Sequence, residues 1–467
     1  MLRIYNTLTG KKEAFKPLEE GKIRMYVCGI TTYDYCHIGH ARVMVGFDII
    51  VRYLRARGFT VEYVRNITDI DDKIINRANE NGEVYTDLTD RFIQAMHDDE
   101  HALKVLRPDQ EPRATDYIGE IIAMVKTLVD KGFAYAADNG DVYYEVEKFA
   151  GYGKLSNKKL EDLLEGVRVN VEQAKQDPRD FALWKSAKAG EVSWDSPWGA
   201  GRPGWHIECS AMSTCCLGNH FDIHGGGPDL VFPHHENEIA QSEAATGEKY
   251  ANTWMHAGAV RVDNEKMSKS LGNFFTIREV LEKYHPEVVR YFLMSSHYRS
   301  PINYSEGSLL EARSGLERMY TALRDYEAVA AASICTLAES DYYPRFTAAM
   351  DDDFNTREAL AVIFELVREL NSSKGQLAQC DDLAALIKGF GSVLGILEES
   401  ADNFLKSGGQ QGTADGLSDA GIDALVVERD TAKQNKDYAR ADEIRKQLSE
   451  QGIALEDSPS GTQWRRA

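Results

Sequence analysis

Apolar runs separated by polar breaks divide the first part of the chain into regular elements. Residues 22–30 (KIRMYVCGI) predict a buried strand, because β-branched and apolar residues run up to a glycine. The next stretch, HIGHARVMVGFDIIVRYLRARG, keeps apolar residues at helical spacing from Val43 to Leu54, and Gly58 suits its end. FTVEYVRNITD then predicts a second strand. A strand, a helix and a strand in this order form a parallel crossover unit, so we expect a doubly wound, nucleotide-binding sheet.

The pattern changes near residue 130. Two short strand-like runs surround Asp138-Asn139-Gly140, which is a strong hairpin signal. Polar, helical KKLEDLLEG and a stretch rich in Trp and Gly follow, so we expect an insertion between two halves of the sheet. From about residue 305, runs such as REALAVIFELVRELNSS predict helices, and the Gly-, Ser- and Gln-rich residues 407–421 are typical of a flexible linker.

These elements predict an α/β fold class. We expect a doubly wound parallel (Rossmann-type) catalytic domain with an inserted subdomain, then a helical bundle and a small C-terminal α/β module. A chain of 467 residues is too long for one compact core, which agrees with several domains. The expected divisions are the two halves of the nucleotide-binding domain at 1–124 and 205–262, the insertion at 125–204, a loop-bearing region at 263–305, the bundle at 306–400, the linker at 401–420 and the C-terminal module at 421–467.

Composition indicates a soluble globular protein, with 43% hydrophobic and 27% charged residues. The start, MLRIYNTLTGKKEAF, has no long apolar run behind its basic residues, so no secretory signal is expected. No charge-free apolar stretch is long enough to span a bilayer, so we expect no membrane partner. The seven cysteines are scattered, which favours reduced thiols in the cytoplasm over a disulfide framework, and some of them could hold a metal ion.

Net charge changes the expected partners. The chain has 54 basic and 74 acidic residues, a balance of −20. An acidic surface repels a polyanion, so charge alone argues against nucleic acid. Only a local basic patch overcomes that objection.

Two histidines, His37 and His40, lie one turn apart at the start of the first predicted helix. Helix N-termini attract phosphate through free N–H groups and the positive end of the helix dipole. Gly39 lets a bulky ligand approach the backbone between the imidazoles, and two imidazole donors there can stabilise charge on a phosphate in a transition state. The alternatives are surface histidines or a metal-binding pair.

A second polar loop, NEKMSKSLGN, carries Lys266 and Lys269 among serines. Two mobile ammonium groups can neutralise a departing pyrophosphate, and placed charge of this kind is the general recipe of phosphoryl and nucleotidyl transfer. The alternative is a solvated loop. HIGH and KMSKS, in this order and flanking a nucleotide-binding sheet, make the chain similar to the class I aminoacyl-tRNA synthetases.

Metal ligands are expected around FDIHGGGPDLVFPHHENEIAQSEAA, residues 221–245. His234 and Glu238 are four residues apart on a predicted helix, which is a suitable pairing for zinc. No CxxC motif exists, so further ligands must come from elsewhere, and Cys28 and Cys209 lie where such a sheet presents its ligands. The spacing leaves four rival ligands open: His235, Cys36, Cys215 and Cys216.

Four stretches together carry a closer resemblance: YVCGITTYDYCHIGHAR, GWHIECSAM, HGGGPDLVFPHHENEIAQSEA and KMSKSLGN. They resemble the cysteinyl-tRNA synthetase family, and the match runs to the final GTQWRR. The resemblance implies one Zn²⁺ ion held by Cys28, Cys209, His234 and Glu238. It implies a cysteine pocket shaped by Thr68, Trp205 and His224. It also implies ATP with Mg²⁺ as a substrate, bound through Gly39, His37, His40, Asp229, His256 and Lys269, with no Mg²⁺ ligand identified.

A metal ion would explain how such an enzyme rejects serine. Cysteine and serine differ by one atom, and an ordinary pocket separates near-isosteres by only roughly 10²-fold, whereas translation needs about 10⁴. Zinc binds thiolate well and lowers the pKa of the thiol, whereas a serine hydroxyl offers neither softness nor easy ionisation. One coordination bond could therefore supply the discrimination without an editing domain, in agreement with the short insertion.

The C-terminal stretch contains basic residues that could form the local basic patch. ALVVERDTAKQNKDYARADEIRKQLSEQGIALED predicts two helices, the second with Ala441, Ile444 and Leu448 inward. The residues expected to contact tRNA are Arg440 and Arg445 on its outer face, Trp464 as a stacking platform for an unpaired base, and Arg465 and Arg466 as phosphate contacts. The alternative is a solvated charged helix with a frayed basic end. The resemblance favours an anticodon-binding module.

The expected reaction has two steps. The cysteine carboxylate attacks the α-phosphate of ATP to give cysteinyl-adenylate and pyrophosphate, and the terminal ribose of tRNA(Cys) then accepts the cysteinyl group. His37, His40, Lys266 and Lys269 are the expected catalytic residues. Two alternatives remain: a related ligase that passes cysteine to an amino sugar, and a catalytically silent tRNA-binding paralogue. Nothing in the sequence demands a dimer, so a monomer is expected.

Overall fold

The computed structural model of the protein describes residues 1–160, 174–188, 190–267, 273–373, 377–407, 417–458 and 461–466. These residues form two compact units, which are described separately. The first unit contains Met1–Val260, His297–Ile302 and Ala348–Asn355. The second contains Arg261–Ser296, Asn303–Thr347 and Thr356–Ala467.

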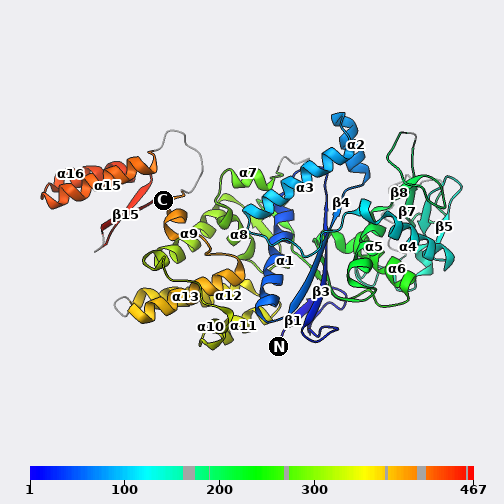
Figure 1. Ribbon diagram of the computed structural model, residues 1–467, viewed down its shortest axis with the longest axis horizontal. Helices are drawn as coiled ribbons and strands as arrows, with labels where there is room; N and C mark the ends of the chain where they lie inside the picture. The colour runs from blue at the N-terminus through cyan, green and yellow to red at the C-terminus, as the bar shows by residue number, and fades with distance from the viewer. Residues whose placement is uncertain are drawn as a thin grey trace. The chain divides into compact units, whose positions relative to one another are not determined.

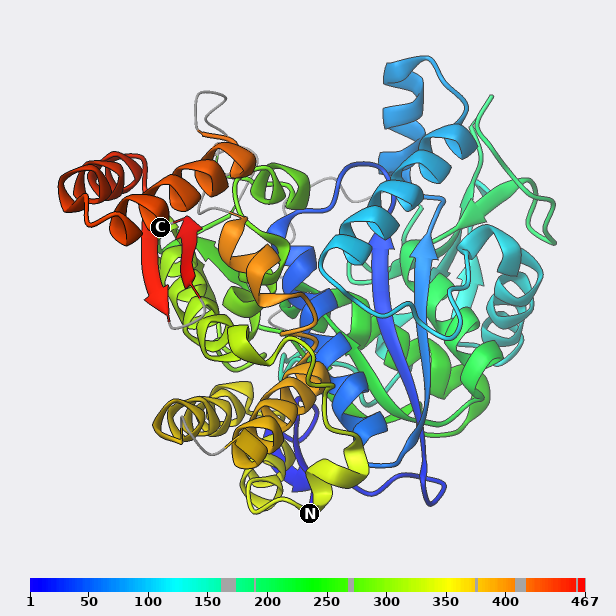
Figure 2. The same cartoon turned by 60° about the vertical axis from the view of Figure 1, so that its left-hand side comes forward.

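A four-stranded parallel sheet forms the centre of the first unit, in the order β10-β9-β3-β4. Its strands are β3 (Lys22–Thr31), β4 (Thr60–Thr68), β9 (Phe221–Gly226) and β10 (Ala251–His256). Helix α1 (Ile38–Ala56) connects β3 to β4, and Figure 2 shows these two strands side by side with α1 beside them. The strand–helix–strand prediction for residues 22–68 is therefore confirmed.

The order of the strands determines where a ligand binds. The chain runs from β3 to β4 on one side and returns later as β9 on the other side of β3. In open parallel sheets, such a switch point leaves a crevice at the carboxyl ends of the strands. The residues at the carboxyl end of β3 therefore lie beside the crevice where a binding site is expected.

An antiparallel sheet, ordered β5-β6-β7-β8, follows helix α4 (Ile118–Asp130) in the first unit. Its strands are β5 (Ala134–Ala136), β6 (Val142–Tyr144), β7 (Phe181–Ser186) and β8 (Gly201–Pro203), and Figure 1 shows α4 near them. The predicted hairpin around Gly140 is confirmed, and this glycine adopts a φ of 88°, which favours glycine. Most of KKLEDLLEG lies outside the described residues.

The other elements of the first unit complete its surface. They are the hairpin β1 (Arg3–Asn6) and β2 (Lys11–Ala14), helices α2 (Asp72–Asn81), α3 (Tyr85–Ala102), α5 (Trp205–Leu217) and α6 (Glu236–Thr246), and a π-helical turn at Val231–His235.

The second unit is mainly helical. It contains α7 (Ile277–Leu281), α8 (Pro286–Met294), α9 (Glu306–Leu323), α10 (Ile334–Glu339), α12 (Thr356–Ser372), α13 (Leu377–Leu394) and α14 (Ala401–Lys406). Short strands β11 (Val260–Val262), β12 (Glu265–Lys266) and β13 (Ile302–Tyr304) form a sheet, and α11 (Tyr343–Asp351) crosses from the second unit into the first.

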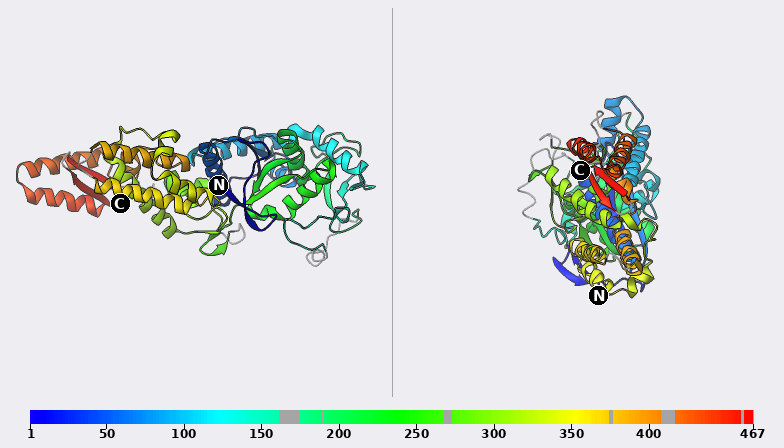
Figure 3. Two further views of the ribbon diagram at one scale, coloured as in Figure 1. Left: turned by 90° about the horizontal axis from the view of Figure 1, so that it is seen from below. Right: turned by 90° about the vertical axis from the view of Figure 1, so that its left-hand side faces the viewer.

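The chain ends in a small module of two helices and a hairpin: α15 (Asp419–Gln434), α16 (Tyr438–Glu450), β14 (Ile453–Ser458) and β15 (Gly461–Arg466). Figure 3 shows α15 and α16 side by side, with the hairpin beside them. Ala441, Ile444 and Leu448 are buried as predicted. Within the described residues, no helix has the length and apolar character needed to cross a membrane.

Candidate functional site

Four potential metal ligands from three distant segments meet in the first unit. Cys28 comes from β3, Cys209 from α5, and His234 and Glu238 from the segment that leads into α6. One atom from each of these residues lies within 4.8 Å of the others, and all four side chains are buried. Cys28 Sγ donates to Glu238 Oε1 at 3.3 Å and lies 3.7 Å from Cys209 Sγ, and His234 Nε2 is 3.1 Å from Glu238 Oε1. The structure thus brings the four predicted ligands together.

Glycines allow this close approach. A Cβ atom on Gly29, next to Cys28, would lie 1.7 Å from the backbone oxygen of Asn66 in the neighbouring strand. A Cβ atom on Gly225 would lie 2.3 Å from the ring of Phe47 in α1, and one on Gly226 would lie 2.9 Å from the ring of His235. Only glycine therefore fits at these positions, which explains the glycine run that precedes the histidines.

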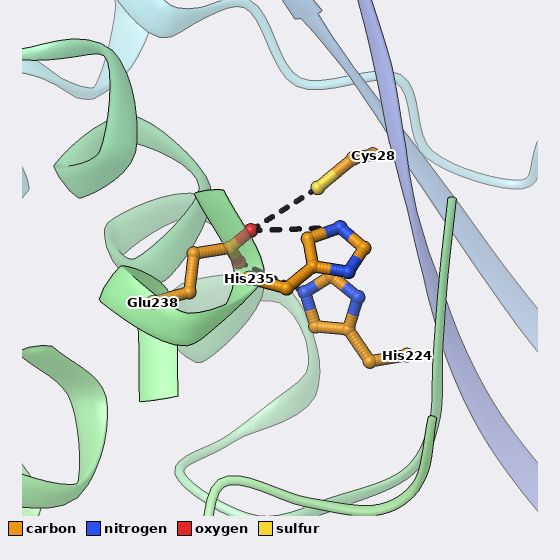
Figure 4. Close-up of side chains that lie close together, drawn as sticks. All are labelled: Cys28, His224, His235 and Glu238. Atoms are coloured by element: carbon orange, nitrogen blue, oxygen red, sulfur yellow. Dashed lines mark hydrogen bonds and ion pairs between the residues drawn. The ribbon is translucent and has the colours of Figure 1, made fainter. Parts of the chain in front are cut away.

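A second possible ligand set overlaps the first. Figure 4 shows the side chains of Cys28, His224, His235 and Glu238 converging, and their ligand atoms also lie within 4.8 Å of one another. His224 Nε2 is 2.8 Å from Glu238 Oε2, and His235 Nε2 is 3.9 Å from Glu238 Oε1. The rival ligand His235 therefore reaches the cluster. Cys36, Cys215 and Cys216 belong to neither set among the described residues.

The charges of the cluster suit a cation. Burial raises the pKa of Glu238, but the neighbouring His224 and His234 outweigh this effect and hold it well below its usual value. A hydrogen bond from the Cys28 thiol lowers the pKa of Cys209. The cluster therefore gathers a carboxylate and a readily ionised thiol in a buried position, and a bound cation would compensate such charges. Two thiols, one imidazole and one carboxylate are a donor set that suits tetrahedral zinc.

The residues predicted to shape an amino-acid pocket border this cluster. The ring of Trp205 lies 4.4 Å from the ring of His234, between centroids. Thr68, the last residue of β4, donates from Oγ1 to Glu208 Oε2 at 3.1 Å. His224 stacks on Trp254 with a centroid distance of 4.4 Å and contacts Glu238, so it lies directly beside the ligands.

Three neighbours of the cluster were not predicted from the sequence: His206, Glu208 and Tyr250. His206 Nδ1 lies 2.9 Å from His234 Nδ1, and the hydroxyl of Tyr250 donates to Glu238 Oε2 at 3.1 Å. Burial, reinforced by Cys209 and Asp71, raises the pKa of Glu208. For Glu208 the available signal was helical spacing in GWHIECSAM. Glu208 lies three residues after Trp205, and residues at this spacing share one face of a helix.

The two histidines of HIGH cap helix α1. His37 is the N-cap residue, and its Nδ1 accepts from the backbone N–H groups of Gly39 and His40 at 3.0 and 3.3 Å. His40 Nδ1 accepts in turn from the N–H of His37 at 3.2 Å, and the rings stack 3.6 Å apart. Because both Nδ1 atoms accept, the proton of each neutral ring is on Nε2. Each ring therefore presents an N–H donor on its other side, at the positive end of the helix.

The other predicted nucleotide contacts differ in accessibility. Asp229 is exposed in a short helical turn after the glycine run. His256 is buried, with Nδ1 2.8 Å from Thr7 Oγ1 and Nε2 2.8 Å from His235 Nδ1. Both ring nitrogens are thus engaged within the fold, and the contact of His256 with adenosine stays a prediction. Lys266 belongs to β12, and Lys269 lies outside the described residues.

Comparison with known proteins identifies the family of the chain. The class I (C) tRNA synthetase catalytic domain matches residues 14–314, and the DALR domain matches residues 345–398. Cysteine–tRNA ligases of Azotobacter vinelandii and Stutzerimonas stutzeri are 64% and 63% identical over 465 and 467 residues, covering 99% and 100% of this chain and 99% of each relative. The chain belongs to the cysteine–tRNA ligase family. It is an enzyme, a ligase that forms aminoacyl-tRNA, and the resemblance seen in its sequence is confirmed.

Solved structures support the fold independently. A Mycobacterium tuberculosis methionyl-tRNA synthetase bound by methionyl-adenylate aligns with a TM-score of 0.59 at 14% identity, covering 82% of this chain and 93% of that one. The LeuRS of Agrobacterium radiobacter, from a ternary complex with tRNA and LeuAMS, aligns with a TM-score of 0.56 at 12% identity, covering 81% and 84%. The predicted Rossmann-type fold class is confirmed.

Residues 415–465 match the anticodon-binding domain of the cysteine–tRNA ligase family. In this module Trp464 is only 2% exposed and packs in the core with Ile422 and Ile444, and its Nε1 donates to Asp423. The structure therefore does not support its predicted role as a stacking platform, because β15 turns this side chain inward.

The predicted tRNA-contacting arginines are accessible to different degrees. Arg440 pairs with Glu428 and Glu443, and Arg466 pairs with Asp419. Arg445 is exposed and has no ion pair among the described residues. Arg465 lies 3.4 Å from Glu317 and from Glu456 and lines a cavity of about 770 Å³ in the second unit.

The capping role of His37 leads to a stability prediction. Replacing His37 by Ala removes the acceptor for two backbone N–H groups and should lower the free energy of unfolding by about 0.5–2 kcal/mol. Replacing it by Asn, a good N-cap residue, should retain most of that stability. Urea unfolding of both variants, followed by circular dichroism, measures the difference. Equal losses in the two variants would contradict a capping role.

Proposed function

We propose that the chain activates cysteine with ATP and transfers it to tRNA(Cys), selecting cysteine through a metal–thiolate contact at Cys28, Cys209, His234 and Glu238. The observation that carries this proposal is the convergence of those four buried ligands at the carboxyl end of the central sheet. Zinc, when bound there, supplies a Lewis acid that favours a thiolate over a hydroxyl group. Free, reduced cysteines throughout the described chain agree with a cytoplasmic enzyme, and we infer that it acts as a monomer.

Activation of cysteine requires its carboxylate to meet the α-phosphate of ATP. The tautomers of His37 and His40 place a proton on each Nε2 at the positive N-terminus of α1, where phosphate binds well. These donors stabilise the charge that grows on the α-phosphate in the transition state, and one such donor is typically worth 10²–10³-fold in rate. Lys266 and Lys269 hold the departing pyrophosphate, and Asp229 contacts adenosine.

The amino-acid side chain is held on the other side of the pocket. Trp205 and His224 border the metal ligands, and Thr68 ends the neighbouring strand β4. The amino acid thus reaches the metal ligands with its side chain while its carboxylate faces the phosphate-binding end of α1. Fixed positions of this kind convert a reaction of two molecules into one within a complex.

The transfer RNA is bound by the second unit. Arg465, Arg318 and Arg368 line the cavity beside the C-terminal module, and Arg440, Arg445 and Arg466 lie on the module itself. Glu317, Glu365 and Glu456 line the same cavity, so its charge is mixed. Local cationic groups of this kind supply the phosphate contacts that the net charge of −20 opposes.

The alternative functions receive less support. A ligase that transfers cysteine to an amino sugar has no need of an anticodon-binding domain, whereas residues 415–465 match one. A catalytically silent paralogue has no need to retain four converging metal ligands and a pair of histidines at the N-terminus of α1.

The first test is cysteine-dependent exchange of labelled pyrophosphate into ATP. We expect exchange with cysteine and a rate with serine about 10⁴-fold lower, because one coordination bond distinguishes the two side chains. Formation of cysteinyl-tRNA from added tRNA(Cys) then tests the second step and excludes a silent paralogue. Comparable exchange with serine would remove the argument for metal-based selection.

Zinc content separates the two overlapping ligand sets. We expect about one zinc ion per chain in the wild type and its loss on dialysis from the Cys209→Ser variant, because Cys209 belongs only to the first set. The His235→Gln variant should retain zinc, since His235 belongs only to the second set. Cys380→Ser, which removes another buried thiol, is the matched control. Elemental analysis showing loss from His235→Gln and retention in Cys209→Ser would reverse the assignment.

A further inference from the structure

Glu208 is a buried acid of which only one oxygen is engaged by the described residues. It lies in the first turn of α5, is 1% exposed, and uses Oε2 to accept the hydrogen bond from Thr68 Oγ1. Its other oxygen, Oε1, has no hydrogen-bond partner among the described residues. A buried polar atom without a partner is costly, so the missing partner calls for an explanation.

The neighbouring acids do not share this property. Asp69 accepts from the backbone N–H and the hydroxyl of Thr115, and Asp71 caps helix α2 by accepting from the N–H of Lys73. Both acids are therefore engaged in holding the fold. Glu208 is the acid beside the pocket that retains an open oxygen.

The hydrogen bonds of Thr68 determine which way its hydroxyl points. A hydroxyl group has one proton and two lone pairs. The Thr68 hydroxyl donates to Glu208 Oε2, so its proton is directed to the carboxyl group. Asn66 Nδ2 donates to the same hydroxyl at 3.4 Å, which leaves one lone pair to accept from an N–H donor.

Thr68 and Glu208 lie where the α-ammonium group of a bound amino acid is expected. Glu208 is adjacent to Cys209, whose Sγ faces Cys28, and it lies one turn after Trp205 on the same helix. An amino acid whose sulfur reaches Cys28 and Cys209 carries its α-ammonium group two bonds from the Cβ atom. That ammonium group is both an N–H donor and a cation.

We propose that Glu208 is a positioning residue: it holds the Thr68 hydroxyl as an acceptor for the α-ammonium group of cysteine. This inference rests on the proposed function, since it places cysteine at the metal ligands. Recognition of cysteine then has two separate anchors, one for sulfur and one for nitrogen.

The test uses Glu208→Gln in the full-length, zinc-loaded enzyme. Glutamine keeps the size of the side chain but removes its charge, and its amide can donate to Thr68 and so reverse the hydroxyl. We expect the KM for cysteine in pyrophosphate exchange to rise about 10- to 100-fold, the usual worth of a hydrogen bond to a charged group. The kcat should change less than about threefold, because an interaction made equally in the ground and transition states affects KM alone.

A ligand that lacks the ammonium group separates this role from a structural one. The inhibition constant of 3-mercaptopropionate, which keeps the thiol and the carboxylate, should be the same in wild type and Glu208→Gln. Zinc content and melting temperature should also be unchanged. The KM for cysteine should rise less in Thr68→Ser, which keeps the hydroxyl, than in Thr68→Val, which should resemble Glu208→Gln. The double variant Thr68→Val/Glu208→Gln should be no worse than either single variant.

Equal rises in the KM for cysteine and in the inhibition constant for 3-mercaptopropionate would overturn the proposal for Glu208, as would a fall in kcat alone. If Glu208→Gln does not fold, Thr68→Val and Thr68→Ser with the same two ligands decide by the same criterion. A wild-type enzyme that exchanges pyrophosphate without regard to cysteine would instead overturn the proposed function itself.

Discussion

Four side chains that prefer water are held together in a buried pocket, and the rest of the site depends on what compensates them. Cys28, Cys209, His234 and Glu238 come from three segments separated by up to about two hundred residues, yet their ligand atoms lie within 4.8 Å. Burying a carboxylate and an ionisable thiol is unfavourable unless a positive charge is close by. In the protein alone, burial lowers the pKa of His234, but the neighbouring Glu238 outweighs this effect and raises it to about 10, so His234 provides positive charge. A divalent cation would provide more of it, and zinc can expand from four to five ligands, which would admit the substrate's sulfur.

The central sheet explains how the two ends of the reaction can share one pocket. Cys28 lies in β3, and the histidines that cap α1 follow it by only nine and twelve residues. The end of one strand thus leads from a metal ligand directly to a helix N-terminus that suits phosphate. Glycines at 29 and 225 let the neighbouring strand and α1 come close enough to close this pocket. Under the proposed function, the same geometry brings the carboxylate of cysteine to the α-phosphate of ATP.

Residue types and spacing predicted much of this from the sequence. The apolar spacing from Val43 to Leu54 was enough to predict α1. Spacing made the four ligands of the first set candidates beside four rivals, and only the family resemblance selected them. The second ligand set, which includes His224 and His235, was missed in part. The adjacent His234 and His235 give no indication in the sequence that both reach the same carboxylate. Glu208 was missed although it lies one turn after Trp205 on α5, because spacing does not show that a single acid is buried.

The prediction that Trp464 stacks on a base did not take into account the backbone conformation of GTQWRR. It is strand β15, whose pairing with β14 and alternation of faces turn Trp464 toward the core and its neighbours outward.

The central claim is that the sulfur of cysteine enters the coordination sphere of a metal held by these four residues. X-ray absorption at the zinc edge counts sulfur ligands directly and requires neither catalysis nor tRNA. The account predicts two sulfur ligands in the enzyme alone, three after saturation with cysteine, and two after addition of serine. A spectrum with saturating cysteine that still shows two sulfur ligands would contradict it.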